Sequence, residues 1–423
     1  MRSLDLLFAT VPMPGHVVPL LPIARALVSR GHRVRWCTGR VFEERVVATG
    51  AEFVAMDPAI DHNGRNVSDL FPERARLTGV AKLRHDLVSL FLDPIPAQVA
   101  DLRRALDAQP ADLVLHDSAH LGAAVLESLG GPRAVTVGVT PMVLPAPDVP
   151  PFGPGLRYRS GSLGRLRNTT VRALLDNGVF KPVYQHRDRI LRELGAPLGP
   201  RGLSSVSPHL HLQNGVAGLE HPREFLPPQV RFVGALVDPV PSTPLPSWWG
   251  RIASVGKPIV HVTQGTVADT NLGELVRPTI RALSDEDVVV VASTGSHDLG
   301  PLPANVYTAP FLPYEQLLPL TKVMVTNGGF GGVQLALAEG VPLVVAGMTE
   351  DKPEVAARVE RSGAGVNLRT STPSEKAIRA AVQKVLGGSA FRGRAWELAA
   401  EYREHDAGEL SADHVEALVC VAA

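Results

Sequence analysis

The sequence has no excess of charge, few cysteines and no long apolar run, and each shortage excludes a class of protein. Its 42 Lys and Arg residues match its 42 Asp and Glu residues, so it lacks the basic surface of proteins that bind nucleic acids or anionic membranes. Two cysteines, Cys37 and Cys420, are too few for a disulfide framework, which favours a reducing compartment. Asp5 interrupts a short apolar run at the N-terminus, which therefore predicts neither a signal peptide nor a membrane span. We expect a cytoplasmic protein whose partners are small molecules, with no nucleic acid and no membrane.

The length and the apolar pattern predict two α/β domains. A chain of 423 residues exceeds what one hydrophobic core usually supports. Short apolar segments alternate with helical patterns, which is typical of βαβ units and parallel sheets. The clearest unit comes first, with a strand at 4–10, a turn rich in proline and glycine, a helix at about 20–28 that Gly31 closes, and a strand at 33–37. Further strands of this sheet are expected at 112–116 and 134–139.

A second alternating series follows a stretch that is rich in proline. Prolines accumulate between residues 222 and 258, which is typical of a linker between domains. After it we expect strands at 259–263, 288–292, 323–326 and 343–346, a helix from about residue 331 and a helix through residue 358. The predicted organisation is an N-terminal domain at 1–220, a linker at 221–257, a second domain at 258–400 and a helical segment at 401–423.

The strongest motif lies in the second half. A predicted strand ends at Thr326, and four glycines, Gly328, Gly329, Gly331 and Gly332, occur within the five positions 328–332, where a helix begins. The free N–H groups and the dipole at the start of such a helix favour a diphosphate. A tight turn without a ligand can also require glycines, so the motif alone is weak evidence.

The residues around this turn resemble the donor signature of the UDP-glycosyltransferase superfamily, family 1, which includes plant secondary-metabolite and bacterial antibiotic glycosyltransferases. The family's Trp-Val-Pro-Gln, Leu-Leu and His-Gly-Gly run is matched without gaps by FLPYEQLLPLTKVMVTNGG, and its Gly-Val-Pro and Asp-Gln positions hold EGVP and Asp-Lys. Its opening signature is matched by PGHVVPLLPIARALVSRGH, so the resemblance spans nearly the whole chain. It implies the GT-B fold, in which two Rossmann-like domains face each other across a cleft and a C-terminal helix packs back on the N-terminal domain.

The resemblance also implies an activity. This is an inverting, metal-independent transfer of a hexose from a nucleotide diphosphate to a hydroxyl of a small hydrophobic natural product such as a polyketide, macrolide or aromatic. The acceptor and the nucleotide sugar are then the partners, no further cofactor is needed, and a homodimer is left open. Two alternatives remain: a sugar-nucleotide epimerase or hydrolase, and a non-catalytic helper of the same fold.

The resemblance assigns roles in donor binding to individual positions. Phe311 would stack on the base in place of the usual Trp, and Leu312 would bond the base through its backbone. Thr266 would contact phosphate together with Gly329, Gly331 and Gly332. Asn327 replaces the family's diphosphate-binding His, and it keeps a neutral N–H donor without a positive charge.

The positions expected to contact the donor's sugars depart from the family in part. Asp351 would accept hydrogen bonds from the transferred sugar, whereas Lys352 replaces the common Gln and leaves the identity of that sugar open. Members that use UDP commonly place a Glu for the ribose where this chain has Leu335, which cannot accept a hydrogen bond. The resemblance therefore favours a dTDP-sugar, although the neighbouring Gln334 could reach the ribose.

His16 and Asp117 are the candidates for catalysis. His16 follows the first strand, in the region beyond strand ends where open α/β sheets bind ligands, and PGH matches the family's catalytic base. A neutral imidazole can take the proton of an acceptor hydroxyl, and a buried carboxylate stabilises the resulting cation. Asp117 stands where the family places that carboxylate. A His that packs or caps the first helix and an Asp that caps the next one are the competing interpretations.

Three further groups of residues are candidates for acceptor or metal binding. Met142, Leu144 and Phe152 lie in a proline-rich excursion and are candidates for an apolar acceptor pocket. The residues HDSAH at 116–120 have the letters of a zinc motif, but they straddle the end of a strand and not one helical face. The acidic DED at 285–287 precedes its strand, which favours a solvated loop over a metal-binding DxD. We therefore predict no metal.

Overall fold

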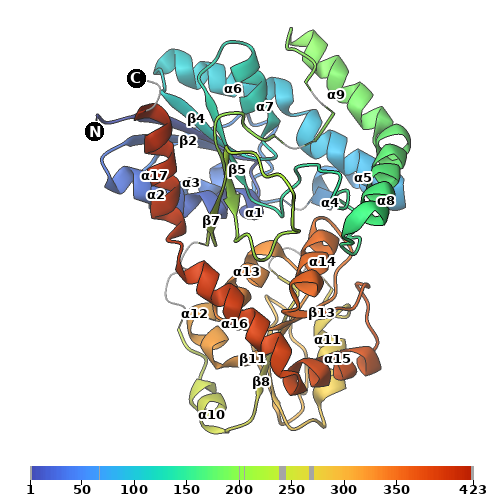
Figure 1. The fold of residues 1–423 in the computed structure, drawn as a ribbon. Helices are drawn as coiled ribbons and strands as arrows, with labels where there is room; N and C mark the ends of the chain where they lie inside the picture. The colour runs from blue at the N-terminus through green and yellow to red at the C-terminus, as the bar shows by residue number, and fades with distance from the viewer. Residues whose placement is uncertain are drawn as a thin grey trace.

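The computed structural model describes residues 2–65, 67–199, 201–203, 205–237, 244–265 and 271–420. Two parallel sheets flanked by helices form two domains that meet end to end (Figure 1). The first sheet has seven strands in the order β3-β2-β1-β4-β5-β6-β7, and the second has six in the order β10-β9-β8-β11-β12-β13. Both sheets therefore wind in the same way, and the α/β class and the GT-B arrangement are confirmed.

The elements of the N-terminal domain are as follows. Its strands are β1 (Asp5–Ala9), β2 (Arg33–Thr38), β3 (Glu52–Ala55), β4 (Leu113–Asp117), β5 (Ala134–Gly138), β6 (His211–Asn214) and β7 (Val230–Gly234). Its helices are α1 (Pro14–Val17), α2 (Leu21–Ser29), α3 (Glu43–Val47), α4 (Val67–Leu70), α5 (Gly79–Leu87), α6 (Ile95–Ala108), α7 (Leu121–Ser128), α8 (Gly161–Leu174) and α9 (Lys181–Glu193).

The C-terminal domain continues this alternation. Its strands are β8 (Ile259–Thr263), β9 (Val289–Ser293), β10 (Val306–Ala309), β11 (Thr321–Thr326), β12 (Leu343–Val345) and β13 (Gly365–Asn367). The remaining helices are α10 (Trp249–Ser254), α11 (Val276–Leu283), α12 (Tyr314–Leu317), α13 (Phe330–Ala338), α14 (Lys352–Ser362), α15 (Glu375–Gly387), α16 (Ser389–Arg403) and α17 (Ala407–Cys420). Short 3₁₀ turns at Val18–Leu20, Arg40–Phe42, Pro72–Arg76 and Leu318–Leu320, and π turns at Val88–Leu92 and Leu175–Val179, adjoin these helices.

The central strands form because their sequences are apolar on both faces. Every residue of β4 is buried, as expected for a strand of a parallel sheet that helices cover on both sides. The predicted strand at 259–263 is confirmed as β8, and the other predicted strands match within one or two residues. The first predicted helix is confirmed as α2, and Gly31 follows it with a φ of +85°. Glycine adopts this left-handed conformation without the steric cost of a Cβ.

The chain crosses between the domains in two places. The predicted linker at 221–257 contains β7, which pairs with β6 in the N-terminal sheet, and α10, whose Ile252 packs in the C-terminal domain. The proline-rich part that joins the domains is therefore shorter than expected, because Pro227 and Pro228 precede a strand. The predicted boundary at 400 falls inside α16.

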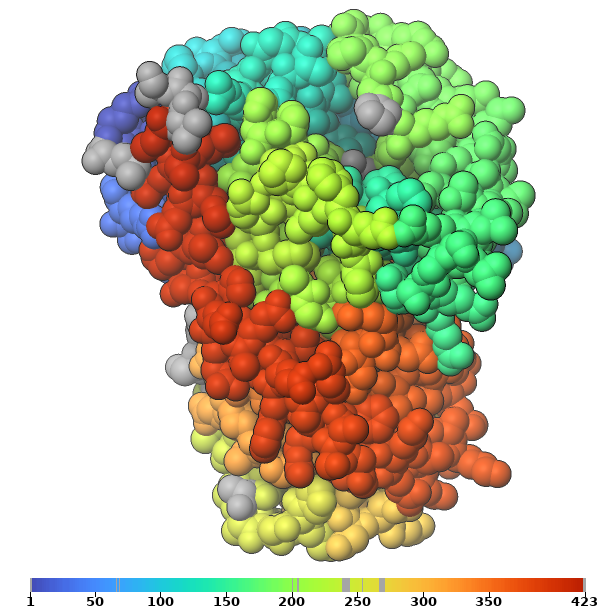
Figure 2. All heavy atoms as spheres, viewed as in Figure 1, coloured from blue at the N-terminus to red at the C-terminus, as the bar shows by residue number. Residues whose placement is uncertain are grey.

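The last helix returns to the N-terminal domain. Figure 2 shows the C-terminal helices running along one face from the second domain onto the first. α17 contacts α2 and β7, and its Ala407, Ala412 and Val415 are part of the N-terminal core. Arg30 at the end of α2 pairs with three of its carboxylates, Glu409, Asp413 and Glu416. The expected return of the C-terminal helix is confirmed.

Candidate active site

The first candidate site lies where the N-terminal sheet reverses its winding. β1 is paired with β4 on one side and β2 on the other, so the loops after β1 and β4 diverge and leave a crevice at their carboxyl ends. Asp117 is the last residue of β4, and His16 lies in α1 directly after β1. His16 Nδ1 is 2.8 Å from Asp117 Oδ1, although the two residues are 101 positions apart in sequence. The structure thus brings together the two predicted catalytic residues.

The charges of this pair support each other. Burial opposes the ionisation of both groups, but the charge and hydrogen bond of each partner outweigh it, so the pKa of Asp117 is lowered and that of His16 is raised. An ionised carboxylate only accepts hydrogen bonds, so Nδ1 of His16 carries the proton when the ring is neutral. Nε2 of His16 has no hydrogen-bond partner in the described part of the chain, and the side chain keeps 15% of its surface exposed. Nε2 is therefore free to accept a proton.

The competing interpretations, in which His16 packs or caps a helix and Asp117 caps one, agree with the structure only in part. His16 lies inside α1, and the first predicted helix, α2, has Leu20 as its N-cap and no side-chain cap, so His16 does not cap it. α7 begins at Leu121 and receives no side-chain cap. Asp117 does order its surroundings, because its oxygens accept hydrogen bonds from Val11 N and Ala119 N, each at 2.8 Å. The carboxylate thus holds the turns after β1 and β4 as well as His16.

The second candidate site lies at the corresponding point of the C-terminal sheet, where β11 is paired with β8. Asn327 follows β11, and its side chain donates to Gln264 O after β8 and accepts from Gly329 N. These bonds tie the two loops together at the start of α13. No side chain of the described residues caps α13, and the N–H groups of an uncapped first turn favour an anionic ligand.

The glycines of this turn serve different purposes. Gly328 has a φ of +90°, and a Cβ there would meet Val345, so the fold itself requires glycine. A Cβ on Gly331 would meet nothing within 4 Å, and Gly332 and Gly329 have only distant neighbours. Local packing therefore does not require these three glycines. Their lack of side chains keeps the helix N-terminus accessible.

A buried chain of polar groups supports the turn after β8, and sequence reasoning missed it. His261 Nε2 is 3.0 Å from Tyr314 Oη, and Ser293 Oγ donates to Thr263 Oγ1 at 2.8 Å. Thr263 Oγ1 also accepts from Gly265 N. The alternation of His261 and Thr263 on one face of β8 was the available signal. The predicted phosphate contact, Thr266, lies outside the described residues.

Asp351 and Lys352 lie at the start of α14. Burial raises the pKa of Asp351 to about 6, while Lys352 and His16 act to lower it. Asp351 lies close enough to His16 of the other domain for the charge of each to act on the pKa of the other. The ammonium of Lys352 bonds Glu350, a residue that the sequence analysis did not single out. This pairing offsets the extra positive charge that Lys352 brings to the site.

The other predicted donor residues lie in different environments. Phe311 is 54% exposed in the loop after β10, so its ring is open to stacking, whereas Leu312 is buried. Gln334 is fully buried, and its Oε1 accepts a 3.4 Å bond from Tyr402 Oη. Leu335 is half-buried. The amide of Gln334 is thus directed into the protein and not toward the open side of α13.

The predicted acceptor residues lie in the loop after β5. Met142 is buried, with its N–H bonded to Glu220 and its carbonyl bonded to Arg358 of α14. Leu144 and Phe152 are half-buried. The loop therefore touches the C-terminal domain, and a role for these side chains in acceptor binding stays a prediction.

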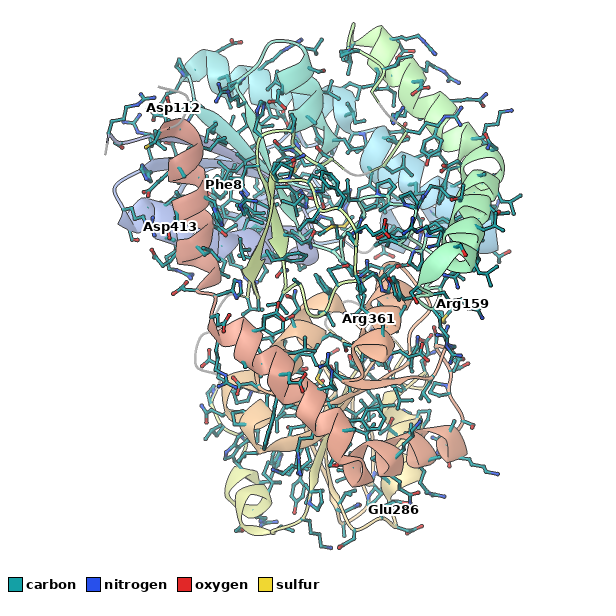
Figure 3. The ribbon with its side chains drawn as sticks, in the orientation of Figure 1. Phe8, Asp112, Arg159, Glu286, Arg361 and Asp413 are labelled. Atoms are coloured by element: carbon teal, nitrogen blue, oxygen red, sulfur yellow. The ribbon has the colours of Figure 1, made fainter. Side chains whose placement is uncertain are left out.

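The HDSAH segment at 116–120 and the DED segment at 285–287 lie in different surroundings. Burial lowers the pKa of His116 and His120 to about 4, and His116 Nδ1 is 2.9 Å from its neighbour's carbonyl, Asp117 O. Figure 3 places Glu286 at the far end of the C-terminal domain, away from the domain contact, and Asp287 pairs with Lys257. Among the described residues, no three His, Cys, Asp or Glu side chains are grouped to hold a metal ion. No helix of the described part is long and apolar enough to cross a membrane.

Comparisons with known proteins identify the family of the chain. Residues 276–417 match the family described as erythromycin biosynthesis protein CIII-like, C-terminal domain. The chain is 44% identical over 419 residues to 4'-demethylrebeccamycin synthase of Lentzea aerocolonigenes, covering 98% of this chain and 99% of the relative. It is 36% identical to UDP-glycosyltransferase 2 of Phaeomoniella chlamydospora, covering 97% and 95%.

Solved structures share the fold. The kitacinnamycin glycosyltransferase superposes with a TM-score of 0.76 at 24% identity, covering 99% of this chain and 100% of that one. The spinosyn rhamnosyltransferase complexed with thymidine diphosphate gives 0.68 at 18% identity, covering 96% and 98%. The chain belongs to the family 1 GT-B glycosyltransferases of natural-product type.

Proposed function

We propose that this glycosyltransferase is inverting and metal-independent, and that it uses His16 as the base that activates a hydroxyl of a small hydrophobic acceptor. The observation that carries the proposal is the contact between His16 and the buried Asp117, which lies within electrostatic reach of Asp351 in the other domain. Nε2 of His16 takes the hydroxyl proton as the acceptor oxygen attacks the anomeric carbon, and Asp117 stabilises the cation that forms. The diphosphate leaves toward the uncapped start of α13, whose N–H groups stabilise its charge. Attack from the side opposite the leaving group inverts the sugar carbon.

The alternative functions fit these residues less well. An epimerase has no acceptor hydroxyl to activate, a non-catalytic helper needs no ionised pair at the crevice, and a hydrolase, which would use the same base on water, is distinguished by its products. We propose that the acceptor resembles the aglycone of 4'-demethylrebeccamycin, because the relative of that name matches the whole chain.

The test offers that aglycone, a macrolide and a phenol to the purified protein, each with UDP- and dTDP-glucose, and analyses the products by mass spectrometry. Glycosylated product supports the proposal. Free sugar alone indicates a hydrolase, an epimerised nucleotide sugar indicates an epimerase, and no turnover with any pair indicates a helper.

We further propose that the donor is a dTDP-sugar. Leu335 cannot accept a hydrogen bond from a ribose 2′-hydroxyl, and Gln334 is buried with its Oε1 accepting from Tyr402 Oη. A buried hydroxyl without a partner costs about 1–3 kcal/mol, and the deoxyribose of dTDP avoids that cost. A structural neighbour is described with thymidine diphosphate bound, whereas a relative at 36% identity is named a UDP-glycosyltransferase. Direct competition between dTDP and UDP for the protein therefore tests which nucleotide it prefers.

Competition calorimetry is expected to show tighter binding of dTDP than of UDP. Leu335→Glu should shift the preference toward UDP by about tenfold, which corresponds to about 1.4 kcal/mol. Leu335→Met is the matched control, because it keeps an apolar side chain of similar size and should keep the preference. Tighter binding of UDP by the unmodified protein would rule out the dTDP proposal.

Asn327→His is expected to keep or raise the affinity for nucleotide diphosphates. An imidazole can replace the amide at the start of α13, and its cationic form adds a charge that favours phosphate. Calorimetry with dTDP and UDP measures the effect, and Asn327→Leu, which removes the donor, should weaken both. Loss of binding in the His variant would show that this turn is shaped differently from the family's.

A further inference from the structure

The loop at 139–157, here called the acceptor loop, is bonded to α14 at the contact between the domains. The loop carries Met142, Leu144 and Phe152, the predicted acceptor contacts. α14 begins directly after Asp351, the predicted contact of the donor sugar. Figure 1 shows α14 on the side of the C-terminal domain that faces the first domain, and Figure 3 places its Arg361 there. Acceptor and donor elements thus meet through one helix.

Glu354, in the first turn of α14, makes the central contact. Its side chain is 2% exposed. Its Oε1 accepts hydrogen bonds from Gly153 N at 2.9 Å and Gly155 N at 2.8 Å. Its Oε2 accepts from Arg358 Nη1 at 2.9 Å. One buried carboxylate therefore holds two backbone positions of the acceptor loop.

Arg358 extends this contact to the start of the acceptor loop. It is 1% exposed and donates to Glu220 Oε2 at 2.8 Å and to Met142 O at 3.2 Å. Glu220 Oε1 in turn accepts from Met142 N at 2.8 Å. Both ends of the loop are thus held against α14 by buried charged groups, and each charge is paired as burial requires.

The contact with α14 leaves no room for a side chain at Gly155. This residue has a φ of +59°, and a Cβ there would lie 2.5 Å from the carbonyl oxygen of Pro353 in α14. Such a distance is far inside van der Waals contact. The absence of a side chain at Gly155 therefore permits the loop to approach the first turn of α14.

We propose that Glu354 is a positioning residue that couples the acceptor loop to Asp351 and Lys352, so that loop and donor helix hold their geometry only together. Glu354 lies three positions after Asp351, in the same helical turn. A shift of the loop is transmitted to this turn through Glu354, and a shift of the turn is transmitted back to the loop. The proposal rests on the proposed role of Asp351 in donor binding. Its structural part does not depend on that role.

The test measures amide hydrogen exchange, nucleotide binding and transfer kinetics in Glu354→Ala and Gly155→Ala. In both variants we expect exchange at 150–157 and 351–355 to speed up by about tenfold or more, with α13 and α15 unchanged. Transfer to the best acceptor of the panel should show a raised acceptor KM and a kcat lowered by about tenfold, because misplacement of substrates is costly. The Kd values for dTDP and UDP should change less than about threefold, since the residues predicted to contact the nucleobase and the phosphates lie outside α14.

Two further variants separate positioning from a general loss of stability. Glu354→Gln keeps an oxygen for Gly153 N and Gly155 N, and it should restore much of the loop's protection. Glu360→Gln removes partly exposed ion pairs of α14 with Arg157 of the same loop and with Arg369, and it should change each readout by less than about twofold.

Unchanged exchange at 150–157 in Glu354→Ala and Gly155→Ala would overturn the proposal. It would equally fail if exchange accelerated throughout the domain and nucleotide binding was lost in both variants. If the unmodified protein transferred no sugar to any acceptor, the proposed function would fail, while the exchange data would still decide the coupling.

Discussion

His16→Ala is expected to lose nearly all transfer while keeping its affinity for the nucleotide. A positioned general base contributes typically about 10²–10⁴-fold to rate, and His16 Nε2 is the free nitrogen of the buried pair. The residues predicted to contact the nucleobase and the phosphates of the donor lie in the other domain, after β8, β10 and β11, so nucleotide binding should change little. Single-turnover transfer assays and calorimetry with dTDP measure the two effects separately.

His186→Ala is the matched control for this variant. His186 also pairs with an aspartate, since its Nε2 is 2.7 Å from Asp93 Oδ1, but both residues are partly exposed outside the crevice. Its loss should leave transfer within about twofold of the unmodified rate. Near-native turnover by His16→Ala would exclude His16 as the base.

Asp117→Asn is expected to slow transfer by about 10²–10⁴-fold. The amide cannot stabilise the cation of His16, and it cannot accept hydrogen bonds at both of its terminal atoms. It therefore presents a donor either to His16 and Ala119 N, at the position of Oδ1, or to Val11 N, at the position of Oδ2. A buried donor left unpaired in this way also costs about 1–3 kcal/mol of stability.

The pH profile separates these roles of Asp117. His16 acts as a base only when it is neutral, and Asp117 is a cause of its raised pKa. The rate of the unmodified enzyme should therefore rise with pH above 6.5, the usual pKa of histidine. In Asp117→Asn the pKa of His16 falls, and the acidic limb should move to lower pH. Asp351, with a pKa of about 6, titrates nearby in both proteins, so the difference between the two profiles is the informative quantity.

Asp112→Asn is the control for this substitution. Asp112 precedes the same strand at its opposite end, where it pairs with Arg2 and accepts from Asp5 N. It should leave both rate and pH profile unchanged. An Asp117→Asn rate equal to the unmodified rate would reduce Asp117 to a residue that only orders its turns.

The sequence predicted the local elements best where burial is complete. β8 and β4 are mostly apolar and every residue in them is buried, so their positions could be predicted from the apolar pattern. β7 was missed because it follows two prolines and exposes Arg231. α8 and α9 were missed because arginines interrupt their apolar pattern and weaken the helical period.

The candidate site divides in the same way. The sequence by itself determined which chemical groups are available, namely a His after the first strand, an Asp that ends another, and a glycine-rich turn at the start of a helix. The resemblance to a family then assigned their roles. Only the tertiary structure decided which groups meet, because contacts such as His16–Asp117 and Gly155–Glu354 join residues 101 and 199 positions apart. Such contacts depend on the order of strands in each sheet and on how the two domains pack, and no local pattern of residues encodes either.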